Sequence, residues 1–341
     1  MSSLASTLTG VAVGGALTFA AVAQPRVILD QFAFKDMHML RVFMTATAGS
    51  AVLTAVLQRL KLFQPFVRPP TSLNLFSRYD GNIIGGALVG TGMAVTGACP
   101  GTVIPQLITG VPSAWPAFIG AMAGGMLWVL VGEQLQRPAL KPQPPVRNTF
   151  QEHLGVTYPS MALIYTIGCL GIVAASSFLD QVPSNPWLGV RGGIALALAQ
   201  GFSMLSTKNA ICSSGTFEES AQWLLWAFQR AIGRIDGSAA LPKPPPCSNA
   251  GSLFGIGEFI GASLVARSLG LQFVSSSTSP ISDDLQFGKL FLGGMALGFG
   301  ARLAGGCTSG HGISGMSAMS VASLITVAMM FGTGIAITAV S

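Results

Sequence analysis

Residues 81–132 of the chain contain no Asp, Glu, Lys or Arg. A soluble fold does not easily accommodate such a run, whereas about 20 consecutive apolar residues are enough for a helix to cross a bilayer core. Residues 154–179 are also uncharged, and charged residues make up 9% of the sequence, against roughly a quarter in soluble domains. The sequence therefore predicts an all-α, multi-pass integral membrane protein.

Apolar runs separated by polar breaks predict about nine transmembrane helices. The break at 58–79 carries four basic residues and no acidic one, whereas 268–288 contains two aspartates and no basic residue. Basic loops face the cytoplasm, so we expect 58–79 inside, 268–288 outside, and a plasma or inner membrane as the host. The formal charge of +6 is scattered through loops, which predicts a lipid bilayer rather than nucleic acid as the partner. The predicted spans are 4–24, 40–57, 81–98, 113–132, 157–179, 188–206, 251–271, 286–305 and 318–338.

The chain repeats itself after 208 residues. "GGALVGTGMAVTGAC" at 85–99 and "GGMALGFGARLAGGC" at 293–307 share five glycines and a cysteine without a gap. Internal duplications of this kind are common in transporters, and loop charge predicts that the two copies are inverted. "AQWLLWAF" at 221–228 is too short to span; if it did span, the orientation of the second copy would reverse. The expected organisation is an N-terminal repeat at 1–133, a Pro-rich basic connector at 134–155 and a C-terminal repeat at 156–341.

Each repeated cysteine precedes a stretch that should break its helix. "CPGTVIPQLITG" starts at Cys99 and "CTSGHGISG" at Cys307, and "NAICSSGTFEES" surrounds Cys212 with similar small and hydroxyl residues. Irregular backbone at membrane depth is tolerated where it is buried or lines a wet cavity, so we expect re-entrant segments along a central pathway. Helix N-termini there would offer free N–H groups to an anion.

The motifs "GACPGT", "NAICSSGTFEE" and "GGCTSGHGISG" together resemble the YeeE/YedE sulfur-transport family, from residue 10 to about residue 336. The resemblance implies a polytopic protein that moves thiosulfate or related sulfur species across a membrane. It also implies that Cys99, Cys212 and Cys307 are pathway cysteines, with substrate contacts in the polar residues beside them. Many members carry another cysteine in a stretch like "RGRFCF"; the comparable segment here reads "QPRVILDQFAF", which argues against a fourth thiol site.

The chemistry of thiosulfate is consistent with a pathway of cysteines and hydroxyl groups. The dianion has three hard oxygens, which accept N–H and O–H donors, and one soft sulfur, which accepts weak bonds from neutral thiols. We therefore expect import of thiosulfate or a similar sulfur anion, without a cofactor and without an enzymatic reaction. The hydroxyl donors expected beside the cysteines are Thr102, Ser213, Ser214, Thr308 and Ser309.

The main alternative is a membrane sulfurtransferase or persulfide carrier in which Cys307 is the nucleophile. His311 is the one candidate base near it, and it is otherwise a hydrogen-bond donor. One histidine and scattered cysteines do not supply the four ligands of a structural zinc site, so no metal is expected. Cys169 is expected to pack in the core, and Cys247 to be incidental.

Three charged residues fall close to the predicted spans. Arg302 precedes Cys307 by about one turn, Glu258 lies in the middle of a span, and Lys208 follows the end of another. An intramembrane charge is a functional hypothesis by default, although charges at helix ends also snorkel to water. Arg302 or Lys208 could pair with Glu258. The sequence leaves open the choice among thiosulfate, sulfide, persulfide and selenium analogues, the coupling ion, and a cytosolic sulfur-carrier partner.

Overall fold

The computed structural model describes residues 3–135, 148–181, 185–235, 245, 250–271 and 284–340. The regular elements in these ranges are helices, and Thr149 and Ser320 form an isolated β-bridge. A helix lies at every predicted span, which confirms the all-α fold class. These helices are α1 (Ser3–Phe19), α3 (His38–Arg59), α4 (Asp80–Thr96), α6 (Ala114–Leu135), α8 (Tyr158–Ser176), α9 (Pro186–Ser206), α11 (Ala250–Ser268), α12 (Asp284–Leu303) and α13 (Val321–Val340).

Helix length and apolarity support a multi-pass membrane protein. Among the described residues, five helices are long and apolar enough to cross a bilayer: α3, α6, α8, α9 and α13. A sixth span results if α12 is joined to the following π-helix η1 (Thr308–Gly315), from which it is bent by 43°. The multi-pass prediction is confirmed, and the number nine stays a prediction.

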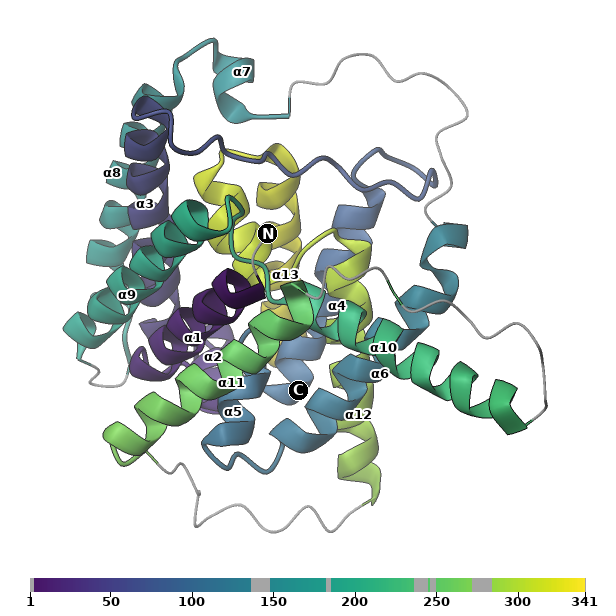
Figure 1. Ribbon diagram of the computed structural model, residues 1–341. Helices are drawn as coiled ribbons and strands as arrows, with labels where there is room; N and C mark the ends of the chain where they lie inside the picture. Colours follow the sequence, from purple (N-terminus) through teal and green to yellow (C-terminus); the bar gives the residue numbers. More distant parts are fainter. Residues whose placement is uncertain are drawn as a thin grey trace.

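The remaining helices were not expected as spans. They are α2 (Pro25–Phe32), α5 (Val103–Ile108), α7 (Phe150–Leu154) and α10 (Ser214–Ile235). The segment 221–228 lies in the middle of α10, which runs out to one side of the molecule (Figure 1). Residues 136–147 of the connector and Cys247 lie outside the described residues, and the proposed repeat boundaries remain predictions.

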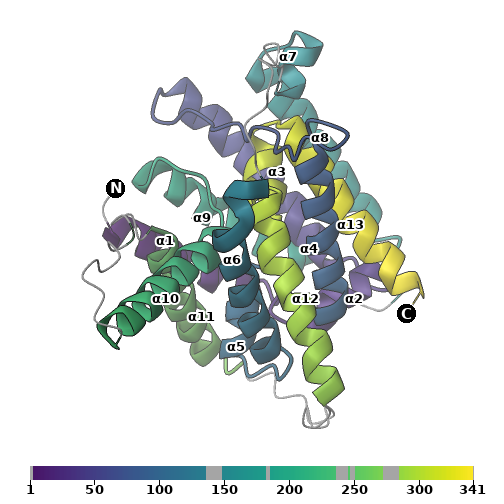
Figure 2. The ribbon, with the colours of Figure 1, turned by 90° about the vertical axis from the view of Figure 1, so that its right-hand side faces the viewer.

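The repeated glycines bring α4 and α12 side by side (Figure 2), and the order of their contacts along the two helices is antiparallel. A Cβ at Gly85 would lie 2.7 Å from the carbonyl oxygen of Gly300, and a Cβ at Gly92 would lie 2.5 Å from that of Gly293. Since Gly293 and Gly300 are the repeat counterparts of Gly85 and Gly92, the contact is reciprocal, as in a two-fold interface. This reciprocity supports an inverted duplication.

Helices α13 and α6 pack against α4 and α12 with the same symmetry between the two copies of the repeat. Gly90 on α4 packs against the carbonyl oxygen of Met330 on α13, and its counterpart Gly298 on α12 packs against that of Ala121 on α6. Small residues permit such backbone approach in a membrane, where dispersion contacts rather than hydrophobic burial hold helices together. The main core cluster runs through this region and includes Cys99 and Cys307.

The ends of the helices agree with the orientation expected from loop charge. In Figure 1, the segment 60–79 and α7 lie at one end of the molecule, while the end of α11 and the start of α12 lie at the other. Helix α4 therefore leaves the first end and α12 leaves the second. The cytoplasmic assignment of the first end rests on its positive charge.

Candidate functional site

Helices α4 and α12 end in the same kind of turn. Gly97 has φ 64° and Gly305 has φ 80°, both in the left-handed region. Glycine is favoured there because it has no Cβ to clash, which makes it a common helix terminator. Each glycine stands two residues before a repeated cysteine, so each thiol lies where the chain leaves its helix.

Each repeated thiol is buried beside a hydroxyl group. The Cys99 amide donates to Thr102 Oγ1 at 2.9 Å, and that hydroxyl lies 3.4 Å from Cys99 Sγ. In the second copy, Cys307 Sγ lies 3.1 Å from Ser309 Oγ. Neither cysteine is more than 3% exposed. Both turns therefore place a thiol and a hydroxyl side by side.

The segment between α9 and α10 brings the third cysteine to the same place. Cys212 Sγ lies 3.2 Å from Ser214 Oγ, and the Cys212 and Cys307 thiols are close enough to interact with each other. The Ser213 amide donates to Ser309 Oγ at 3.3 Å. Residues 211–214 thus lie against the start of η1 and join two of the predicted thiols directly.

The first copy faces the same cluster. A Cβ at Gly101 would lie 3.4 Å from Ser213 Oγ and 3.9 Å from Cys99 Sγ. Thr102 and Thr308 line a common cavity with Cys99 and Ser309. The cysteines and hydroxyl residues predicted from the sequence are therefore neighbours in the structure.

Arg68 is the residue of this cluster that the sequence analysis missed. Its Nε donates to the carbonyl oxygen of Gly310 at 2.8 Å, and its Nη1 donates to that of Gly305 at 2.6 Å. A Cβ at Gly310 would lie 2.8 Å from Cys212 Sγ and 3.0 Å from Arg68 Nη2. A permanent positive charge therefore lies beside the thiols.

Nothing in the local pattern singled out Arg68. It is one of four basic residues in 58–79, and the other three behave as loop charges. Arg59 and Lys61 are exposed, and the Arg78 guanidinium lies 4.9 Å from the centre of the Tyr79 ring. The two prolines after Arg68 are the one local difference, and they indicate extended chain rather than burial.

His311 faces the scaffold. It is fully buried, with Nε2 3.0 Å from the carbonyl oxygen of Ala304 and Nδ1 2.9 Å from Ser323 Oγ. A neutral ring that donates from Nε2 and accepts at Nδ1 satisfies both contacts. Asn82 Nδ2 donates to the same carbonyl of Ala304 at 3.0 Å. His311 therefore braces the turn before Cys307.

The hydrogen bonds and ion pairs of the charged residues predicted near the site go to groups outside the thiol cluster, although the charge of Arg302 also acts on the Cys212 thiol. Arg302 forms an ion pair with Glu218 of α10, and the Lys208 ammonium donates to the carbonyl oxygen of Leu62 at 3.1 Å. Glu258 is fully buried, and neither carboxylate oxygen has a hydrogen-bond partner. Glu258 is thus not paired with Arg302 or Lys208, the partners that the sequence suggested.

Two cavities flank the segment that carries Cys212. The first, here called the thiol cavity, has a volume of about 20 Å³ and is lined by Cys99, Thr102, Thr308 and Ser309 together with apolar side chains of α1 and α3. This volume accommodates about one water molecule. Ile211 borders this cavity and the second one as well, so the thiol cluster lies between them.

The second, here called the polar cavity, has a volume of about 190 Å³. Cys212 and Glu219 line it, with hydroxyl side chains of α1 and α9. Glu219 belongs to α10, which is not among the helices apolar enough to span, and burial raises the pKa of its carboxyl group. Amides of Ser252 and Gly251 donate to that carboxylate and oppose the rise in pKa.

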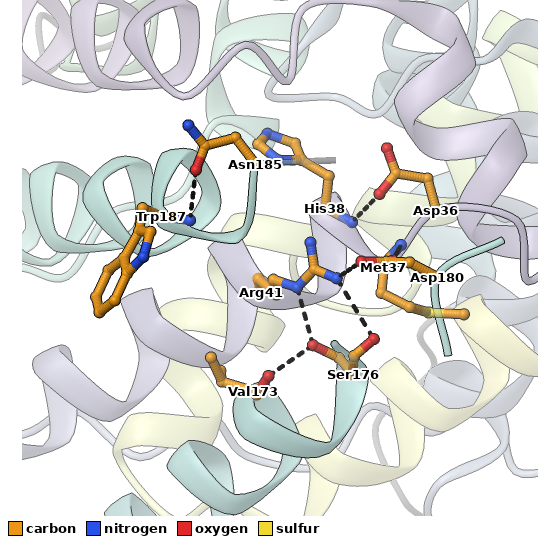
Figure 3. A network of polar contacts seen from close by, with 9 residues as sticks. All are labelled: Asp36, Met37, His38, Arg41, Val173, Ser176, Asp180, Asn185 and Trp187. Atoms are coloured by element: carbon orange, nitrogen blue, oxygen red, sulfur yellow. Dashed lines mark hydrogen bonds and ion pairs between the residues drawn. The ribbon is translucent and has the colours of Figure 1, made fainter. Parts of the chain in front are cut away.

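A separate charge pair lies at the start of α3 (Figure 3). Arg41 is fully buried and forms an ion pair with Asp180, while its Nε donates to Ser176 Oγ at 3.0 Å. The amide of Met37 donates to Asp180 Oδ1 at 2.9 Å. These contacts tie α3 to the end of α8, which makes the pair a structural clasp.

Within the described part of the chain, no group of three or more His, Cys, Asp or Glu could hold a metal ion.

Helices broken at buried turns within a multi-pass bundle are typical of membrane transporters. Comparison with known proteins gives the family of this one: a model described as "Sulphur transport" matches residues 20–337, and the chain belongs to that family. The chain is also 25% identical over 317 residues to the thiosulfate transporter TsuA of Spirochaeta thermophila, covering 86% of this chain and 85% of that protein. The resemblance to YeeE/YedE sulfur-transport proteins is thereby confirmed.

Proposed function

We propose that the protein imports thiosulfate, or a closely related sulfur anion, through a passage lined by Cys99, Cys212 and Cys307. The family and the similarity to a thiosulfate transporter support a sulfur anion as substrate. The observation that carries the proposal is the convergence of the three thiols and the Arg68 guanidinium on the start of η1.

The positive charge of Arg68 favours binding of an anion at the start of η1. The carbonyl groups at the end of a helix carry partial negative charge, which would repel thiosulfate. Arg68 covers the carbonyl of Gly305 with one nitrogen and that of Gly310 with another. The guanidinium adds a full positive charge, and the hydroxyls of Ser213 and Ser309 supply further donors for the anion oxygens.

The thiols contact the terminal sulfur atom of the anion. A neutral S–H group is a weak donor, and sulfur is a polarisable contact partner. Several weak contacts in sequence permit release as well as entry, which conduction requires. The absence of a side chain at Gly310 leaves Cys212 Sγ reachable, because a Cβ there would stand 2.8 Å from the sulfur.

The proposed passage would be too narrow for the anion in the conformation described here. The thiol cavity has a volume of about 20 Å³, which is room for roughly one water molecule and too little for thiosulfate. Apolar side chains close it from α1 and α3, among them Leu17 and Phe43. Passage therefore requires these helices to part from the turns that carry Cys99 and Cys307.

Uptake of ³⁵S-thiosulfate into proteoliposomes tests the proposal. We expect saturable uptake that excess unlabelled thiosulfate abolishes and that equimolar sulfate leaves nearly unchanged, because sulfate lacks the soft terminal sulfur. Selenosulfate, which keeps a soft terminal atom, should compete. Inhibition by sulfate as strong as by thiosulfate would show that the thiols do not select the substrate.

One observation favours the sulfurtransferase alternative. The Arg68 guanidinium lies beside Cys212, and nearby positive charge stabilises a thiolate. Against a nucleophilic Cys307, both nitrogens of His311 are engaged elsewhere. Mass spectrometry of the protein after thiosulfate exposure separates the two: the transport proposal expects unmodified cysteines, and the alternative expects a reducible gain of one sulfur atom.

A further inference from the structure

Glu258 is a buried acidic residue to which the proposed substrate passage assigns no role. It lies in the middle of α11 with no exposed surface, and both of its carboxylate oxygens lack a hydrogen-bond partner. A carboxylate in such a place is neutralised by a partner or by a proton. Among the described residues it has no ion-pair partner, so the group that satisfies it is a bound proton.

Glu258 lies at the tightest part of the contact between α1 and α11. Gly257 and Gly261 on α11 meet the carbonyl oxygens of Thr7 and Val11, and Gly10 and Gly14 on α1 meet the α11 backbone at 254–258. Both helices thus use a G-x-x-x-G spacing, the form that lets membrane helices approach most closely. Water reaches Glu258 only when this contact loosens or the neighbouring cavity extends to it.

That cavity is one helical turn away. Phe254, four residues before Glu258 and hence on the same face of α11, lines the polar cavity together with Cys212. Helix α1 borders the polar cavity and the thiol cavity as well. A displacement of α1 that widens the passage at the thiols therefore also changes the surroundings of Glu258.

The elements packed against α11 supply no compensating charge. Helices α1 and α5 contain no titratable residue. In the first turns of α10, Glu218 pairs with Arg302, and Glu219 accepts amide hydrogens from the first turn of α11. Among the side chains that the structure describes, the cation of α10 is Arg230, which stacks on Trp226 near the far end of that helix. Gln106 of α5 is polar and uncharged, and its Oε1 has no hydrogen-bond donor.

We propose that Glu258 is the proton-binding site that couples proton entry to uptake of the sulfur anion. The inference rests on the proposed function, since a dianion entering a cell against an inside-negative potential needs a driving ion. Glu258 holds the proton while α1 and α11 are closed, and it releases the proton when loosening of their contact lets water solvate the carboxylate. Release takes place toward the polar cavity.

The test uses proteoliposomes loaded with a pH-sensitive dye and held at zero membrane potential. In the wild type, thiosulfate added outside should acidify the interior, and lowering the external pH by one unit should raise the initial uptake rate several-fold. Glu258→Gln keeps the shape of the protonated side chain. This variant should retain exchange of internal for external thiosulfate within about two-fold, while acidification and the response to external pH disappear.

Glu152→Gln is the matched control. Glu152 is exposed in α7, where it completes a capping box that glutamine can also complete, so this variant should behave like the wild type. Wild-type exchange without acidification overturns the proton site and leaves the proposed function intact, even if Glu258→Gln fails to fold. Acidification that persists in Glu258→Gln also overturns it. A wild type without any thiosulfate exchange would overturn the proposed function itself.

Discussion

The Nε atom of Arg68 donates to the carbonyl oxygen of Gly310 at 2.8 Å, across 242 residues of chain. With its second bond, to Gly305, this guanidinium fixes the turn that presents Cys307. A loop residue from the N-terminal half thus completes a site in the C-terminal half. The thiol cluster depends on docking of the segment 60–79 as much as on the helices.

Replacing Arg68 should impair transport even when the charge is kept. Lysine presents a point charge and lacks the planar fork that reaches two carbonyl oxygens. We expect Arg68→Lys to lower the initial uptake rate about tenfold, and Arg68→Ala to lower it further. Arg59→Lys, at the exposed end of α3, is the control and should transport normally. Normal uptake by Arg68→Lys would mean that the positive charge alone suffices.

The repeated thiols should be essential, and the packing thiol dispensable. Cys99→Ala and Cys307→Ala remove the soft contacts and should each reduce uptake more than tenfold without loss of folded protein. Cys307→Ser keeps a donor for oxygen but matches sulfur poorly, so a small residual rate is expected. Cys169→Ala, on α8 and away from both cavities, should retain nearly all activity. Wild-type uptake by Cys307→Ala would refute the cysteine-lined passage.

The antiparallel contact of α4 and α12 should not tolerate a methyl group. A Cβ at Gly85 would stand 2.5 Å from the amide nitrogen of Ala304, a backbone atom that cannot turn aside. Overpacking of this kind costs about 1–3 kcal/mol, so Gly85→Ala should lower the thermal unfolding midpoint in detergent by several degrees. Gly171→Ala, on a face of α8 with open space around it, serves as control. Equal midpoints for the two variants would contradict the packing described.

The clasp at the start of α3 should matter for stability and not for substrate affinity. Asp180→Ala leaves the fully buried Arg41 without its ion-pair partner, a loss that typically costs about 3–5 kcal/mol. The double variant Arg41→Met with Asp180→Leu removes both charges and should recover much of the stability. Unfolding midpoints measure the first effect, and KM for thiosulfate should stay constant. A changed KM in the double variant would place the clasp in the transport path.

The orientation can be checked with a membrane-impermeant maleimide. Cysteines introduced at the exposed positions Lys61 and His153 should react from one side of the membrane, and a cysteine at the exposed position Ser268 from the other. The segment after α3 and helix α7 lie at one end of the molecule, and the end of α11 lies at the other (Figure 1). Subtracting the labelling of the unsubstituted protein accounts for the native thiols. Reaction of all three positions from a single side would remove the inverted arrangement.

The positions of the apolar helices could be predicted because long uncharged runs have few other structures open to them. The predicted span 188–206 corresponds to α9 at Pro186–Ser206, and 81–98 corresponds to α4 at Asp80–Thr96, which Gly97 caps. The extra helices escaped prediction for a physical reason. Helix α10 is amphipathic rather than uniformly apolar, and α5 contains six residues, too few for a periodic pattern.

The thiol cluster could be anticipated in part. The duplicated setting drew attention to Cys99 and Cys307, and the small polar residues after Cys212 matched it. The docking of Arg68, the pairing of Arg302 with Glu218 and the isolation of Glu258 depend on contacts between segments far apart in sequence. Arg41 and Asp180 likewise meet only in the fold, so no local pattern could reveal these partners.

The reciprocal contacts of Gly85 with Gly300 and of Gly92 with Gly293 bear on the origin of the molecule. Each copy of the repeat uses the same surface against the other, and such an isologous contact closes on itself. Two separate half-length chains, inserted into a membrane in opposite directions, would meet through this surface as a dimer. The contact between α4 and α12 is the one expected if the present chain arose by fusion of such a pair, with the interface of the former dimer kept between these two helices.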